Sequence, residues 1–194
     1  YKRDYTNMDF MNYAVQEKLR ENKTGKQTAI MELLENIPST VEENYTYRNK
    51  GDLTFTKVNS VWGLDQKSLS NGAAYADLDN DGDLDILAFE WAFGATIDYY
   101  QNRQVEDGLP CGQMKFVLAD NWWGKISTCA PCNSYAFNSF CRRARPLHTG
   151  GFSLLAVDLD NDQDKDILVG RDNCTDLVRI TNLGTPTSVV MDNS

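Results

Sequence analysis

The sequence predicts a mainly β protein built from repeated strand–loop–strand units and preceded by a short helical segment. Two nearly identical acidic nonapeptides, at residues 77–85 and 158–166, are the main observation behind this prediction. Each nonapeptide lies between two short apolar runs of the kind that form buried strands. Residues 1–40 differ, because their apolar residues follow the spacing of helices.

The first 40 residues are expected to form a helical cap or a docking segment. Thr6 or Asn7 can cap a first helix, and Gly25 ends it. A second apolar pattern of helical spacing follows and ends at the Ile37-Pro38 dipeptide. Packing against the β part of the chain is the favoured role of this segment, and docking to a partner is the alternative.

Each acidic nonapeptide carries aspartates at loop positions 1, 3, 5, 7 and 9, which are candidate ligands for one cation. These residues are Asp77, Asp79, Asp81, Asp83 and Asp85 in the first loop, and Asp158, Asp160, Asp162, Asp164 and Asp166 in the second. Neighbouring carboxylates repel by on the order of several kcal/mol at an effective dielectric constant of about 20. A bound dication removes this cost, and flexible oxygen-only ligation favours Ca²⁺. We expect side-chain oxygens from positions 1, 3, 5 and 9 and a backbone carbonyl from position 7.

The residues around these positions define the type of loop. An EF-hand needs a glutamate at position 12, where this chain has Ala88 and Val169. Position 6 is Gly82 in the first loop, which suits a positive φ, but Gln163 in the second. The second of the two calcium sites is therefore expected to be the weaker. A pair of solvated acidic turns without an ion is the less favoured alternative.

The pattern Asp-x-Asp-x-Asp-Gly-x-x-Asp between two strands resembles the FG-GAP or VCBS-type repeat, the calcium-loop blade of integrin α-subunit β-propellers. Residues 44–55, 62–64 and 70–77 more narrowly resemble CRTAC-type propellers of Bacteroidetes, which are often paired with an ASPIC/UnbV module. The section from Cys111 onward resembles another group of secreted Bacteroidetes VCBS proteins. The resemblance implies β-propeller blades, calcium in the Asp-rich loops and export. It identifies no ligand.

Residues 41–194 are accordingly expected to form propeller blades. A hairpin at about 45–58 precedes a calcium blade at about 71–120, a Cys-rich insertion at 121–150 and a second calcium blade at 151–194. A propeller ring closes with about four to eight blades. We therefore expect the missing blades to come from a longer parent protein or from other copies, and the start at Tyr1 fits a processed or partial chain.

Five cysteines concentrate in the second half of the chain. The disulfide candidates are Cys111, Cys129, Cys132 and Cys141, within the range 111–141, and Cys174 completes the set. Disulfides that staple the insertion are favoured over free thiols, a zinc site or a redox pair. The pairing stays open, and the odd number leaves one cysteine unpaired or intermolecular.

The insertion also contains adjacent tryptophans, Trp122 and Trp123. They are candidates for an aromatic platform that binds sugar or peptide. Packing at a joint between blades is the favoured alternative.

The charge distribution limits the possible partners. The two loops hold ten of the 28 acidic residues, which leaves 18 against 19 Lys and Arg, so the net charge of −9 is local to the loops. No basic surface for nucleic acid is indicated. No stretch approaches the roughly 18 apolar residues of a transmembrane span.

The sequence predicts a binding module and not an enzyme. His148 is the only histidine, and the nucleophile-elbow, Walker and dinucleotide motifs are absent. We expect a secreted or surface-exposed calcium-binding β-propeller module for adhesion or protein–protein assembly, with an extracellular protein or glycan ligand. The alternatives are a carbohydrate-binding or carbohydrate-active propeller, and a structural subunit that polymerises through open blade edges.

Overall fold

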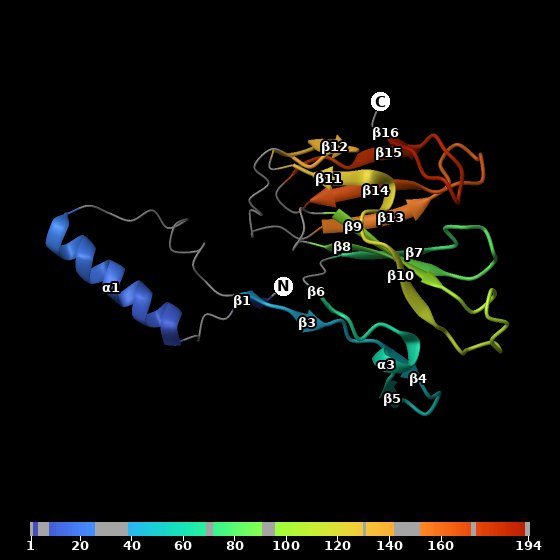
Figure 1. The fold of residues 1–194 in the computed structure, drawn as a ribbon, viewed down its shortest axis with the longest axis horizontal. Helices are drawn as coiled ribbons and strands as arrows, with labels where there is room; N and C mark the ends of the chain where they lie inside the picture. Colours follow the sequence, from blue (N-terminus) through green and yellow to red (C-terminus); the bar gives the residue numbers. More distant parts are fainter. Residues whose placement is uncertain are drawn as a thin grey trace. The chain divides into compact units, whose positions relative to one another are not determined.

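A computed structural model describes residues 2–3, 8–25, 39–68, 72–90, 96–129, 131–141, 152–171 and 174–192. The chain is mainly β, as predicted, with several small antiparallel sheets and one long helix (Figure 1). It divides into two compact units, residues 1–42 and 43–194.

The N-terminal unit contains helix α1, Met8–Thr24, and the paired strands β1, Lys2–Arg3, and β2, Ser39–Thr40. Gly25 follows the helix with a φ of 67°, which confirms the expected helix end. The second expected helix falls on residues outside the described ranges. None of the helices that the structure describes has the length and apolar character needed to cross a membrane.

The first large sheet is an antiparallel meander of four consecutive strands. Its strands are β7, Ala73–Ala76; β8, Asp85–Glu90; β9, Thr96–Asn102; and β10, Phe116–Asp120. Buried and exposed residues alternate along β7, whereas most of β8 is buried on both faces. The sheet therefore has packing neighbours on both sides, as a blade between other blades requires.

The second large sheet repeats this order. Its strands are β13, Phe152–Val157; β14, Asp166–Arg171; β15, Val178–Asn182; and β16, Met191–Asp192. The first strands of the two sheets, β7 and β13, lie side by side. Two four-stranded meanders that meet along their first strands have the arrangement of neighbouring propeller blades.

Shorter elements flank the two sheets. The expected hairpin before the first sheet is present as β4, Tyr47–Asn49, and β5, Phe55–Lys57. Other short elements around it are β3, Glu42–Glu43; helix α3, Asn59–Trp62; and β6, Lys67–Ser68. The insertion contains the 3-10 turn η1, Trp123–Lys125, and the paired strands β11, Ile126–Thr128, and β12, Tyr135–Phe137. The described part of the insertion therefore contains regular structure of its own.

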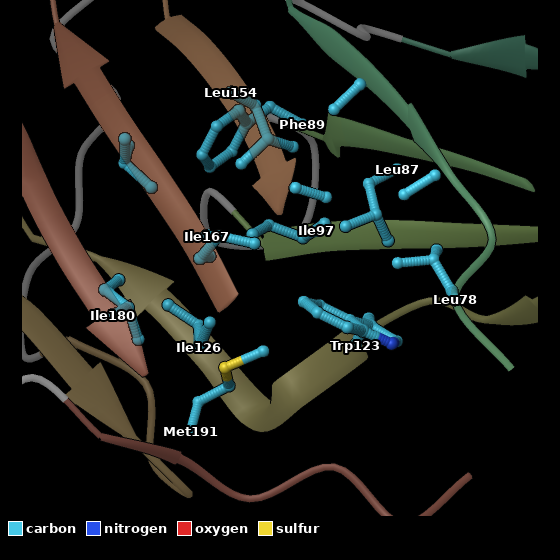
Figure 2. Packing of buried hydrophobic residues seen from close by; sticks show 14 of the residues in the cluster. Leu78, Leu87, Phe89, Ile97, Trp123, Ile126, Leu154, Ile167, Ile180 and Met191 are labelled. Atoms are coloured by element: carbon cyan, nitrogen blue, oxygen red, sulfur yellow. The ribbon is translucent and has the colours of Figure 1, made fainter. Parts of the chain in front are cut away.

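The main hydrophobic core lies between the two large sheets. Figure 2 shows the facing side chains, which are Leu87, Phe89 and Ile97 from the first sheet, Leu154, Ile167 and Ile180 from the second, and Trp123 and Ile126 from the insertion. The rings of Phe89 and Phe152 pack across this interface with centroids 4.6 Å apart. Each such side chain stabilises the fold by about 1.5–3 kcal/mol when fully buried.

The two sheets also approach closely at Gly72, just before β7. Gly72 has a φ of 87°, and a Cβ atom there would lie 2.4 Å from the carbonyl oxygen of Phe152. Glycine is therefore needed for both the backbone conformation and the close contact with β13.

Two disulfides tie the insertion together and to the second sheet. Cys129 pairs with Cys141, and Cys132 pairs with Cys174. This pairing corrects the expectation of disulfides confined to 111–141, because Cys111 is a free, exposed thiol and Cys174 takes part instead. The reason is spatial: Arg171, at the end of β14, donates hydrogen bonds to the carbonyls of Cys129 and Pro131 and holds the insertion beside Cys174.

Ile167→Ala is expected to lower the free energy of unfolding by about 2–5 kcal/mol, because it leaves a cavity where both sheets meet. Urea denaturation measures the change. Leu155→Ala, which truncates an exposed residue on the neighbouring strand β13, is the matched control and should change stability much less. Equal losses in both variants would contradict the position of the core.

Alkylation of the unfolded, unreduced protein is expected to label one cysteine, Cys111, which peptide mass spectrometry identifies. Removing the longer link with Cys132→Ala and Cys174→Ala is expected to cost about 2–4 kcal/mol of stability, because the unfolded chain gains freedom. Labelling of a second cysteine without reductant would contradict the observed pairing.

Candidate metal centre

Both acidic loops are turns between the first two strands of a large sheet. Loop 77–85 joins β7 to β8, and loop 158–166 joins β13 to β14. Antiparallel pairing places Ala76 opposite Asp85, and Val157 opposite Asp166. The first and ninth loop positions are therefore brought together by strand register alone.

The two loops have the same backbone conformation. Position 4 is left-handed in both, with φ of 62° at Asn80 and 66° at Asn161. Position 6 is also left-handed, with φ of 98° at Gly82 and 77° at Gln163. The expected turn at Gly82 is confirmed, and Gln163 adopts it despite a cost of roughly 1 kcal/mol for a non-glycine residue.

The aspartate at position 1 organises each turn by accepting backbone hydrogen bonds. Asp77 accepts from the amides of Asp81 and Gly82, at 3.1 and 3.2 Å. In the second loop Asp158 accepts from Asn161 and Gln163, at 2.6 and 3.0 Å. These bonds hold the other carboxylates in place.

The aspartate at position 9 is buried in each loop and is held by the third strand of its sheet. Asp85 Oδ1 accepts from the amide of Asn102 at 2.8 Å, and its Oδ2 accepts from Leu78 at 3.0 Å. Asp166 Oδ1 accepts from the amide of Asn182, also at 2.8 Å. Both asparagines are buried, and the sequence interpretation assigned them no part in the loops. The sequence signal that could have indicated their role is the asparagine at the end of the third strand of both sheets.

Carboxylates of the first loop converge closely enough to bind one ion. One oxygen from each of Asp77, Asp79 and Asp85 lies within 4.8 Å of the others. Asp79 and Asp81 form a second such group with Glu106, which lies beyond β9. The sequence did not indicate Glu106, because only the tertiary structure brings it to the loop.

The first loop fits a hard cation. Asp79 Oδ1, Asp81 Oδ2 and Asp83 Oδ1 are buried and have no hydrogen-bond partner among the described residues. Burial raises the pKa of Asp85 to about 7, although hydrogen bonds from the Asn102 and Leu78 amides oppose this. A bound dication would satisfy the unpartnered oxygens and stabilise the carboxylate forms.

Neutral side chains from β9 donate hydrogen bonds to the carboxylates of the first loop. The Tyr99 hydroxyl donates to Asp79 Oδ2 at 3.3 Å and to Asp85 Oδ2 at 3.4 Å. Gln101 Nε2 donates to Asp79 Oδ2 at 2.7 Å. Burial raises the pKa of Tyr99 well above its usual value, so this hydroxyl stays a neutral donor.

The second loop brings a different set of carboxylates together. Oxygens of Asp158, Asp160 and Asp162 lie within 4.8 Å of one another, whereas Asp166 does not belong to that group. Asp166 is instead paired with Arg179 Nη2 at 3.2 Å. Asp164 is buried, and burial raises its pKa to about 6.

The two loops are directly connected. The side-chain amide of Asn80 donates to the backbone carbonyl of Gln163 at 2.7 Å. This hydrogen bond joins position 4 of the first loop to position 6 of the second. Each loop therefore helps to hold the other in its folded conformation.

Residues 37–88 match the family model of the FG-GAP-like repeat. The chain contains an FG-GAP-type repeat. The matched region runs from before the β4–β5 hairpin, through the first acidic loop, into β8. No curated protein matches the chain. The metal-fitting loop 77–85 thus lies inside the FG-GAP match, and loop 158–166 lies outside it.

The two tryptophans that follow the FG-GAP match have separate environments. Trp123 is 4% exposed and belongs to the main core. Trp122 is half-buried, stacks on Phe140 with ring centroids 4.3 Å apart, and donates its indole N–H to the Ile126 carbonyl. The pair therefore does not present a shared open aromatic face, and Trp123 has the packing role that the sequence favoured.

A pair of buried carboxylates, Glu90 and Asp98, lies outside the FG-GAP loops, on β8 and β9. Burial raises the pKa of Asp98 to about 6, the Glu90 charge adds to the shift, and a hydrogen bond from Tyr100 opposes it. An ionised Asp98 is therefore unfavourable in this sheet.

Asp98→Asn is expected to stabilise the protein more at about pH 8 than at about pH 4, by on the order of 1–3 kcal/mol. The folded-state pKa of Asp98 lies above its usual value, so the native protein loses stability as pH rises from about 4 through about 6. Asparagine carries no charge at either pH, so the Asp98→Asn variant does not lose this stability. Urea denaturation of both proteins at the two pH values measures it, with exposed Asp65→Asn as the control. An equal effect at both pH values would contradict the raised pKa.

Proposed function

We propose that this protein is an extracellular FG-GAP repeat module whose blades are stiffened by calcium and which mediates adhesion or protein–protein assembly. The observation that carries this proposal is the convergence of Asp77, Asp79 and Asp85 at the turn between β7 and β8. The buried, unpartnered oxygens of Asp79 and Asp81 in the same loop call for a cation.

Calcium is the ion that this arrangement suits. All candidate ligands of the first loop are oxygens, and Glu106 adds a further carboxylate beyond the loop itself. Ca²⁺ accepts six to eight oxygens in flexible geometry. In this role the ion holds the turn in one conformation, and the turn fixes the relative positions of β7 and β8. The hydrogen bond between the Asn102 amide and Asp85 extends this effect to β9.

An extracellular setting agrees with the covalent structure. Two disulfides are present, and such bonds persist in oxidising compartments. Extracellular calcium modules bind their ion at about 10⁻⁴–10⁻³ M, so calcium outside the cell would keep the first loop loaded.

The proposed activity is binding and not catalysis. The converging aspartates are assigned to the ion, whose charge makes them poor general acids. Apolar side chains on the two adjacent first strands are available for contact with another protein, since Tyr75 and Leu155 are 67% and 53% exposed. Exposed apolar surface of this kind marks interaction sites when it is contiguous.

Asp79→Ala is expected to lower the melting temperature more in millimolar calcium than in chelator, because the substitution removes a ligand. Differential scanning calorimetry in both media measures the difference. Asp160→Ala in the second loop should show a smaller calcium-dependent effect, and exposed Asp65→Ala is the control without one. Equal losses for Asp79→Ala in calcium and in chelator would overturn the metal role.

The assembly role is tested on the wild-type chain by sedimentation velocity over a range of concentrations, in calcium and in chelator. Calcium-dependent association that the double variant Tyr75→Ser, Leu155→Ser weakens is the supporting result. A chain that stays monomeric and whose tryptophan fluorescence responds to added glycans would favour carbohydrate binding instead.

A further inference from the structure

The two acidic loops differ in the side chain that bridges their third and ninth positions. In the first sheet this residue is Tyr99, which pairs with Leu87, two residues after Asp85. In the second sheet Arg179 pairs with Leu168, two residues after Asp166. Tyr99 and Arg179 therefore occupy the same place in the two repeats.

Both side chains reach the same pair of aspartates in their own loops. The Tyr99 hydroxyl lies 3.3 Å from Asp79 and 3.4 Å from Asp85. Arg179 Nη2 lies 3.4 Å from Asp160 and 3.2 Å from Asp166. The contacts match, but the bridging group is a neutral hydroxyl in one loop and a permanent cation in the other.

We propose that Arg179 is a built-in cation for loop 158–166, so that this loop keeps its shape without calcium and the protein binds calcium far more strongly at loop 77–85 than at loop 158–166. The guanidinium carries positive charge to the point where the carboxylates of positions 3 and 9 meet. A calcium ion bound between the same carboxylates would be repelled by it. This inference rests on calcium binding by the first loop.

The charge at position 8 of the loops also differs. Position 8 is Leu84 in the first loop and Lys165 in the second, which adds another positive charge there. In the first loop, by contrast, no carboxylate pairs with a Lys or Arg among the residues that the structure describes.

The arrangement of the carboxylates also differs between the two loops. The ninth-position Asp85 belongs to the converging group of the first loop, whereas the ninth-position Asp166 is outside that of the second. Asp166 is 1% exposed and has Arg179 as its charged partner. A calcium ion held by Asp158, Asp160 and Asp162 would share Asp160 with Arg179, whose Nη2 lies 3.4 Å from that carboxylate.

The test exchanges the two bridging residues. Isothermal titration with calcium chloride is expected to give one site for the wild type, two for Arg179→Tyr and none for Tyr99→Arg. The affinity of the second loop should rise by about a hundredfold or more in Arg179→Tyr. Because Tyr is already tolerated at this place in the first sheet, the Arg179→Tyr variant is expected to fold.

Hydrogen exchange in chelator provides a readout that does not depend on calcium. Amides of residues 158–166 should remain protected in the wild type and lose protection in Arg179→Gln, while residues 77–85 should be less protected than in calcium. Unchanged protection in Arg179→Gln would overturn the structural role of the arginine.

The outcomes separate this inference from the proposed function. Two sites of similar affinity in the wild type would overturn the inference and leave the calcium-stiffened module intact. No site in the wild type but one in Arg179→Tyr would overturn calcium binding by loop 77–85, and with it the proposed function, and would support only the role of Arg179 in loop 158–166. No calcium binding by either protein would overturn both.

Discussion

The constraint on which this structure depends is the repulsion among five aspartates in a nine-residue turn. Strand register and hydrogen bonds to backbone amides force these carboxylates together, as the contacts of Asp77 and Asp85 show. Burial makes the repulsion stronger because it removes the screening effect of water. A positive charge in the turn would relieve this repulsion, and the two turns differ in the positive charge that their own sheets supply.

The turns matter because they are joined to the core through short connections. Asp85 and Asp166 begin the strands that carry Leu87 and Ile167 into the interface between the sheets. Asn102 and Asn182 tie the same aspartates to the third strands. Charge neutralisation in a loop and apolar packing between the blades consequently stabilise the same strands.

The two repeats share a backbone but differ in chemistry. Loop 77–85 lies within the FG-GAP match and has three unpartnered buried oxygens and a neutral tyrosine, whereas loop 158–166 has one such oxygen, on Asp164, and an arginine at the equivalent place. The hydrogen bond from Asn80 to Gln163 joins the two. On the proposal made above, a calcium-dependent blade lies beside a calcium-independent one, and part of the module stays ordered when the ion is lost.

The amino-acid sequence was enough to predict the strand–loop–strand units, the two sets of aspartates, the helix end at Gly25 and the mainly β class, because these depend on local spacing and turn chemistry. The distant residues that complete the sites could not be predicted in this way, because their positions depend on the fold. Glu106, Arg179 and the Cys132–Cys174 disulfide are brought into place by sheet register and by the packing of the insertion. Trp123 entered the core and Cys111 stayed free for the same reason, since burial is set by contacts between segments far apart in the chain.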